Sequence, residues 1–104
     1  MGPMILEVAI LNVNFGDETE FEQAFVSAQK LISKMDGYIS HQLQRSIENS
    51  NRYILLVNWR NLEDHEIGFR ESKEYQEWRK LLHHFYDPFP EVEHYKALFS
   101  GRAN

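Results

Sequence analysis

Two segments of this chain are apolar on both faces, and they constrain its fold more than any other feature. Residues 4–13 and 52–59 are rich in Ile, Leu and Val, which occupy neighbouring positions rather than every second one. Both segments are short, so each is predicted to be a β-strand. A sheet that contains such strands needs apolar cover on both of its faces.

The segment after the first strand has the pattern of an amphipathic helix. Residues 14–16 form a predicted turn, and Asp17 followed by Glu20 fits an N-cap with its capping-box partner. Gly37 is predicted to end the helix as its C′ residue. Between these signals one stripe of apolar residues recurs at the helical period: Phe21, Ala24, Phe25, Ala28, Leu31, Ile32 and Met35.

Two further helical segments are predicted before the last strand. Asn61 fits the N-cap of a short helix that Gly68 weakens, and Ser72 fits the N-cap of a second helix that runs to about His84. The prolines within residues 87–90 forbid further helix, and this turn is expected to direct the last strand towards a partner subunit. The buried side of the second helix is predicted to comprise Tyr75, Trp78, Leu81, Leu82 and Phe85.

The remaining strands are predicted at residues 38–45 and 92–99. Ile39, His41 and Leu43 are expected to share one face of the first of these strands. The order of elements is then β-α-β-β-α-β, which predicts an α+β, ferredoxin-like fold with both helices on one face of a four-stranded antiparallel sheet.

One domain is predicted over residues 4–99, with flexible ends at residues 1–3 and 100–104. Two helices cover only one face of the sheet, and the other face would expose a large apolar surface in a monomer. The simplest remedy is a two-fold homodimer that packs open face against open face, as in a dimeric α+β barrel.

Composition excludes several classes of function. A formal net charge of −5 argues against nucleic-acid binding, which draws on a surplus of Lys and Arg. No apolar run is long enough to cross a bilayer, so no membrane association is expected. The absence of cysteine excludes disulfides and thiolate metal sites, and it suits a cytoplasmic location.

Residues 59–95 hold most of the groups that could support chemistry. Four of the five histidines and both tryptophans fall in this segment. Aromatic side chains beside groups that ionise or form hydrogen bonds are what a small-molecule pocket needs. They are equally what a packed core with a solvated edge contains, so composition leaves both interpretations open.

Several short motifs resemble one known family. They are Gly37-Tyr38 at the start of the second strand, Trp59 at the end of the third strand, Phe69-Arg70-x-Ser72-x-x-Tyr75-x-x-Trp78, and Val92-Glu93-His94-Tyr95. Together they resemble antibiotic biosynthesis monooxygenase (ABM) domains over nearly the whole chain, and the segment 83–95 resembles a bacterial subgroup of them. The resemblance implies a dimeric α+β barrel. It also implies a cofactor-independent monooxygenase of a quinol-like or polycyclic aromatic small molecule.

The resemblance further implies four site residues. Trp59 and Phe69 would bind substrate as pocket walls, Arg79 would stabilise an oxyanion, and His65 would move a proton. An asparagine of the family's polyketide oxygenases corresponds here to Leu55, so one part of their proton shuttle is absent. Core packing for Trp59, and a solvent-exposed helix position for His65 or Arg79, are the alternatives.

The sequence lacks the residues that haem degradation and metal binding would require. The haem-degrading members of the family place an axial histidine where this chain has Arg79, although His83 lies one helical turn further on. The histidines are not spaced as a close metal-binding motif, so no metal and no cofactor is expected. A non-catalytic small-ligand-binding or stress-response dimer of the same fold remains the alternative function.

Overall fold

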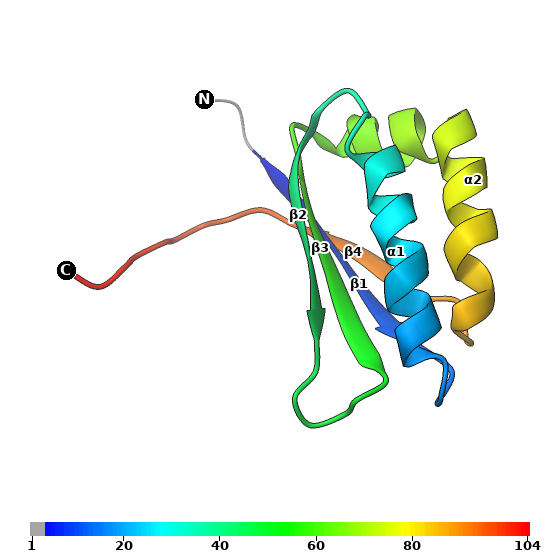
Figure 1. Cartoon of the computed structure of the whole chain (residues 1–104). Helices are drawn as coiled ribbons and strands as arrows, with labels where there is room; N and C mark the ends of the chain where they lie inside the picture. The colour runs from blue at the N-terminus through cyan, green and yellow to red at the C-terminus, as the bar shows by residue number, and fades with distance from the viewer. Residues whose placement is uncertain (1–3) are drawn as a thin grey trace.

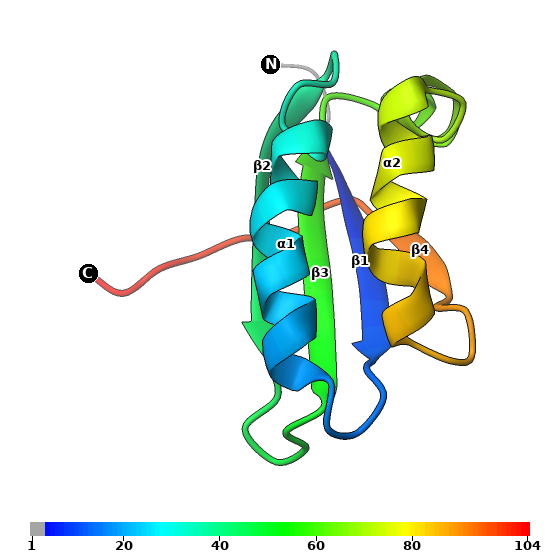
Figure 2. The ribbon, with the colours of Figure 1, turned by 45° about the vertical axis from the view of Figure 1, so that its right-hand side comes forward.

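A four-stranded antiparallel sheet carries two helices on one face in the computed structural model, which describes residues 4–104 (Figures 1 and 2). The strands lie in the order β2-β3-β1-β4, so the predicted ferredoxin-like α+β fold is confirmed. The expected loose end at residues 1–3 lies outside the described residues. In chain order the elements are β1 (Ile5–Asn12), α1 (Glu18–Ile32), β2 (Tyr38–Arg45), β3 (Arg52–Trp59), the π-helical turn η1 (Asp64–Phe69), α2 (Lys73–Leu82), the 3-10 turn η2 (His83–Phe85) and β4 (Val92–Tyr95).

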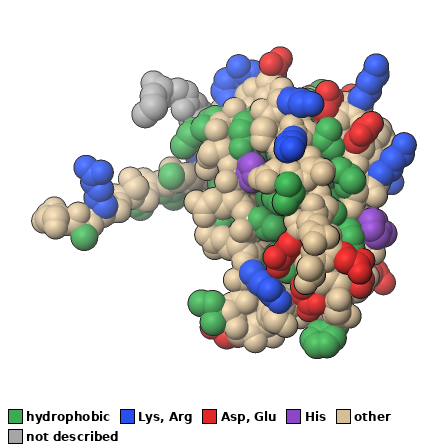
Figure 3. Space-filling view, in the orientation of Figure 1, with side chains coloured by type: hydrophobic (Ala, Val, Ile, Leu, Met, Phe, Trp, Pro, Cys, Tyr) green, Lys and Arg blue, Asp and Glu red, His purple; other side chains and the backbone are tan. Residues whose placement is uncertain are grey.

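The core lies between the sheet and the helices. Alternate residues of β3 are buried, which places Tyr53 and Trp59 against the helical layer. Aromatic rings meet across this layer, with centroid distances of 4.8 Å between Phe21 and Tyr53 and 5.8 Å between Phe25 and Trp78. The predicted apolar stripe faces the core, since all seven of its residues are buried or partly buried, although Met35 lies beyond the end of α1. Most charged side chains seen in Figure 3 project from the helical half of the molecule.

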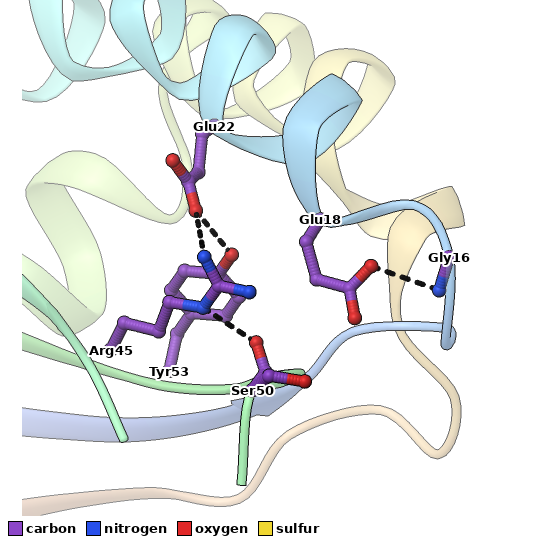
Figure 4. A network of polar contacts seen from close by, with 6 residues as sticks. All are labelled: Gly16, Glu18, Glu22, Arg45, Ser50 and Tyr53. Atoms are coloured by element: carbon purple, nitrogen blue, oxygen red, sulfur yellow. Dashed lines mark hydrogen bonds and ion pairs between the residues drawn. The ribbon is translucent and has the colours of Figure 1, made fainter. Parts of the chain in front are cut away.

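The start of α1 differs from the predicted capping box. Asp17 is the N-cap residue, but its side chain makes no cap hydrogen bond, and its backbone is outside the extended region usual for such caps. The turn before the helix is instead closed by Glu18, whose Oε1 accepts a hydrogen bond of 2.9 Å from the Gly16 amide (Figure 4). The helix start was predicted correctly, and Glu20 as capping partner was wrong.

Gly37 also has a role other than the predicted one. The helix ends at Ile32 with Ser33 as C-cap, so Gly37 lies beyond the C′ position. Its φ of +83° makes the turn into β2, and a Cβ atom here would overlap the Asp64 carboxylate. Its carbonyl accepts a hydrogen bond of 2.7 Å from the Arg60 amide. Glycine is required here by the positive φ and by close packing against Asp64, the first residue of η1.

Two strand predictions need correction. A bulge between Tyr38 and Ser40 turns Ile39 outward, where it is 46% exposed, while Tyr38 packs against the core. The last strand ends at Tyr95 rather than at residue 99. Tyr95 pairs with Leu6, the second residue of β1. Residues after Tyr95 therefore have almost no β1 residues left as pairing partners. The chain after β4 runs away from the sheet (Figure 1).

Two predicted caps are present. The Asn61 Oδ1 atom accepts a hydrogen bond of 2.9 Å from the Asp64 amide, and the Ser72 Oγ atom accepts one of 3.1 Å from the Tyr75 amide. The first holds the start of η1 and the second holds the start of α2. These two caps place η1 across one end of the sheet, over Trp59.

A separate polar network joins α1 to the β2–β3 hairpin (Figure 4). The Tyr53 hydroxyl donates to the Glu22 carboxylate, and Arg45 lies 3.4 Å from the same carboxylate. Arg45 also donates to the Ser50 carbonyl at 2.6 Å. Both charged side chains of the Arg45–Glu22 pair are about half exposed, so this ion pair itself contributes little to stability.

Candidate functional site

A small cavity lies between the helical face of the sheet and α2, with η1 at one side and the turn before β4 at another. Its volume is about 40 Å³, enough for a few water molecules. Its walls include Phe69, Trp78 and Phe89. The titratable and charged residues that line it are Glu7, His65, Arg70, Tyr75, His83 and Tyr86.

Glu7 is a buried carboxyl group in the middle of an apolar strand. It occupies an inward position of β1 and is only 5% exposed. The Trp59 indole Nε1 donates a hydrogen bond of 2.9 Å to its Oε1 atom. Burial raises the pKa of Glu7 from 4.5 to about 7, although the Trp59 hydrogen bond and the charge of Arg70 act in the opposite direction. The carboxyl group therefore gains and loses its proton near neutral pH.

His65 lies against this carboxyl group. Its Nε2 is 3.3 Å from Glu7 Oε1, and its Nδ1 is 2.7 Å from Nε2 of His94. Its ring stacks on Trp59 with a centroid distance of 5.4 Å. Burial lowers the pKa of His65 to about 3, and the positive charges of His94 and Arg70 add to this effect. The contact with Glu7 therefore joins a neutral imidazole to a carboxyl group, and it is not an imidazolium–carboxylate ion pair.

Three of the four predicted site residues come together. Trp59, His65 and Phe69 form one aromatic cluster, in which the Trp59–Phe69 and His65–Phe69 centroid distances are 6.0 and 6.3 Å. Arg79 lies apart from them: it is exposed on α2 and lines a shallow surface hollow with Gln76, Lys80 and His83. The arginine that lines the cavity is Arg70. The role predicted for Arg79 stays a prediction.

Sequence reasoning missed Glu7 and His94 as members of the site. The signal for Glu7 was present, because a carboxylate at an inward position between Ile5 and Ala9 is out of place in an apolar strand. No comparable signal existed for His94. It faces Glu7 because β4 pairs with β1 in a register that sets these two residues opposite each other. The pairing register of β4 depends on the residue at which the preceding turn ends, and the sequence around His94 does not indicate that residue.

The described part of the chain, residues 4–104, contains no group of three or more His, Asp or Glu side chains placed to hold a metal ion. No helix in the same range has the length and apolar character needed to cross a membrane. The arrangement that remains is a carboxyl group, two imidazoles and an indole N–H beside a small aromatic cavity. Such a set can accept, hold and pass on a proton.

Comparison with known proteins identifies the family. The family model described as antibiotic biosynthesis monooxygenase matches residues 4–81. The chain belongs to this family. The uncharacterised protein YczJ of Bacillus subtilis (strain 168) is 54% identical over 95 residues, which are 91% of this chain and 100% of that protein.

Solved structures agree with the fold of this ABM-family chain. A candidate antibiotic biosynthesis monooxygenase from Bordetella bronchiseptica superimposes with a TM-score of 0.89 at 36% identity, covering 93% of this chain and 99% of that one. The cofactor-independent oxygenase SnoaB from Streptomyces nogalater gives a TM-score of 0.73 at 18% identity, covering 99% and 97%. At that identity the likeness to SnoaB shows the shared fold alone.

Proposed function

We propose that this ABM-family protein is a cofactor-independent monooxygenase that acts on a quinol-like or polycyclic aromatic small molecule. The observation that carries the proposal is the Glu7–His65 pair, which is buried beside Trp59 at the wall of an aromatic cavity. Membership of the family supports the reaction class. A buried carboxyl group that exchanges its proton near neutral pH, in contact with an imidazole, supplies the base that this chemistry requires of a protein.

The chemistry needs no bound cofactor because the substrate supplies the electrons. With anthrone as an example, a base removes a proton from the CH₂ carbon, and the carbanion transfers one electron to O₂. The resulting radical pair combines into a C–O bond as a peroxide. Loss of water from the hydroperoxide then leaves a carbonyl group. One atom of O₂ enters the quinone and the other leaves as water, and the substrate carbon supplies all four electrons.

In this proposal the ionised Glu7 carboxyl group accepts the substrate proton. Both of its contacts, from Trp59 and from His65, use Oε1, which leaves Oε2 for a ligand in the cavity. The Trp59 N–H fixes the orientation of the carboxyl group, and Phe69 forms a wall. A cation is needed to stabilise the substrate oxyanion. Arg70 is placed to supply it, and Arg79 is the cation to compare with it.

Substrate entry requires the cavity to open. A volume of about 40 Å³ is far below the roughly 300 Å³ or more of typical small-molecule sites. Phe89 lines the cavity but is 59% exposed, so an outward movement of the turn that carries it would enlarge the site. The same small volume favours the second candidate function, a non-catalytic dimer that binds a small ligand. Turnover decides between the two.

We also propose that two copies pack through the open faces of their sheets. β1 and β3 present apolar side chains on the face that the helices leave uncovered: Leu6, Val8, Ile10, Ile54 and Leu56. Ile10 is 48% exposed in the single chain. Burying this strip against its own copy removes the apolar surface that the isolated chain leaves in water.

The test is aerobic turnover by metal-free protein of anthrone and of a substituted hydroquinone, followed by oxygen uptake and product formation above the uncatalysed rate. Glu7→Gln and His65→Gln are expected to lose on the order of 100-fold or more in rate, as for loss of a general base. The turnover rates of Arg70→Gln and Arg79→Gln show which of the two arginines stabilises the substrate oxyanion. Wild-type protein that binds these aromatics without turnover would refute catalysis and support the binding alternative.

A further inference from the structure

We propose that His94 and His65 form a proton relay that connects the buried Glu7 carboxyl group with solvent. It rests on the proposed function, because it explains how Glu7 is returned to its ionised form after each turnover. It goes beyond that function by assigning a role to His94. It also stands on geometry of its own, so it can be tested without any substrate.

The four side chains form one line from the interior to the surface. His65 Nε2 lies 3.3 Å from Glu7 Oε1, and His65 Nδ1 lies 2.7 Å from His94 Nε2. His94 Nδ1 lies 3.9 Å from Glu66 Oε1. Side-chain exposure rises at the outer end, from 6% for Glu7 and 3% for His65 to 19% for His94 and 51% for Glu66. The line begins at the cavity and ends in water.

His65 contacts one neighbour through each ring nitrogen, which is the geometry for passing a proton through the ring. His94 contacts His65 through Nε2, and its Nδ1 lies on the side of the exposed Glu66. With Glu7 ionised, His65 donates from Nε2 to Glu7, and His94 donates from Nε2 to His65. With Glu7 protonated, every hydrogen bond is reversed: Glu7 donates to His65 Nε2, and His65 donates from Nδ1 to His94. His94 then carries its proton on Nδ1, towards Glu66.

The two patterns differ by one proton, and in both of them one proton lies between Glu7 and His65 and one lies between His65 and His94. Changing from one to the other moves a proton between Glu7 and the surface, while both imidazoles are neutral before and after. No bond other than N–H and O–H bonds forms or breaks. A proton that Oε2 accepts from the substrate reaches His65 after the carboxyl group rotates about its Cγ–Cδ bond, which exchanges the two oxygen atoms beside the Trp59 N–H.

The surroundings fit a neutral relay. Arg70 is the cation near this line, and its charge acts on Glu7, His65 and His94 together. Burial lowers the pKa of His94, as it does that of His65, and Glu66 partly offsets this. The other titratable groups that face the cavity come from α2, from η2 and from the turn after η2: Tyr75, His83 and Tyr86.

The direct test is ¹⁵N NMR of the histidine side chains across a pH titration, without substrate. In wild-type protein we expect His65 and His94 to remain neutral near neutral pH and to exchange Nδ1–H for Nε2–H tautomers together, with one shared midpoint, as Glu7 ionises. His94→Gln retains an amide donor for His65 Nδ1 but cannot pass a proton, so the His65 tautomer should no longer switch at that midpoint. His84→Gln, at an exposed histidine outside the line, is the matched control and should leave the switch unchanged.

A His65 tautomer that stays fixed throughout the titration would overturn the relay. So would a His65 ring that titrates independently of His94. Neither result depends on turnover, so the relay can fail while the proposed oxygenase activity stands, and the reverse also holds. In Glu66→Gln the tautomers should still switch, because the outer end of the line is open to water.

Where turnover is observed, the relay adds a kinetic signature. His94→Gln should slow steady-state turnover by about tenfold or more. Millimolar imidazole buffer should restore the rate of a His94→Ala variant, in which the removed ring leaves space for the buffer. The wild-type rate and the His84→Gln rate should not depend on buffer concentration. A His94→Gln enzyme with the wild-type rate at low buffer concentration would refute the role of His94.

Discussion

Replacing Glu7 by glutamine should make the protein more stable at alkaline pH while removing its activity. The amide has nearly the shape of the carboxyl group, and its oxygen can still accept the Trp59 hydrogen bond and lie against His65 Nε2. The charge is what changes. In the folded protein burial disfavours the ionised form, so ionisation of Glu7 costs stability that the unfolded chain does not lose.

The magnitude follows from the pKa shift. The pKa of Glu7 rises from 4.5 to about 7 on folding, which at ~1.4 kcal/mol per unit amounts to about 3 kcal/mol. Below pH 4.5 the carboxyl group is protonated in the folded and the unfolded state, so it does not lower the free energy of unfolding. As pH rises from 4.5 to about 7, the unfolded chain releases the proton first, so the free energy of unfolding falls. Above about pH 7 the carboxyl group is ionised in both states, and the free energy of unfolding is lowered by the full amount.

The neighbouring histidine has the opposite sign. Because the pKa of His65 falls to about 3 on folding, the unfolded chain takes up a proton as pH falls below 6.5, and stability falls with it. Between pH 4.5 and 6.5 the effects of Glu7 and His65 on the pH dependence of the free energy of unfolding nearly cancel in wild-type protein. The difference between Glu7→Gln and wild type isolates the carboxyl group, since the remaining groups titrate in both proteins.

The assay is urea unfolding at a fixed protein concentration at about pH 4 and about pH 8.5, because oligomerisation would make stability depend on concentration. We expect the two proteins to be nearly equal at the lower pH and the variant to be more stable by about 3 kcal/mol at the higher pH. A variant destabilised equally at both values would refute the reasoning, because the folded protein would then hold the carboxylate at no cost.

Three further predictions concern the fold. Ser72→Ala should lower the free energy of unfolding by about 1 kcal/mol through loss of the α2 N-cap, measured by urea denaturation with Ser27→Ala, on the exposed side of α1, as control. Gly37→Ala should cost about 2 kcal/mol or more, because its φ is +83° and a Cβ has no room, whereas Gly68→Ala should be tolerated; equal losses would contradict this. Leu56→Glu on the open sheet face should yield monomers in light scattering, and a dimer that persists would exclude this face as the interface.

Much of the fold could be predicted because local patterns agree with tertiary packing. The period of the α1 stripe, the apolar runs of β1 and β3 and the caps at Asn61 and Ser72 each depend on neighbouring residues alone. The errors arose where distant segments meet. Gly37 is needed because its backbone packs against Asp64, and β4 ends where its pairing with β1 ends, at Tyr95.

The site was predictable only in part, for a related reason. Trp59, His65 and Phe69 come from motifs within a short stretch of chain, and the fold keeps them together. Glu7 and His94 come from opposite ends of the chain and meet through strand register, to which no local pattern points. Arg79 and Arg70 both lie in the segment from η1 to α2, and only the path of the chain through the cap at Ser72 shows which of them faces the cavity.

Oxidation of anthrone under ¹⁸O₂ by metal-free protein, followed by mass spectrometry of the quinone, tests the central proposal most directly. We expect wild-type protein to form product that carries one ¹⁸O atom from O₂, at a rate well above the uncatalysed oxidation. Glu7→Gln and His65→Gln should fall close to the uncatalysed rate. Product formed by either variant as fast as by wild-type protein, or product whose new oxygen atom comes from water and carries no ¹⁸O, would contradict a monooxygenase that works through the Glu7–His65 pair.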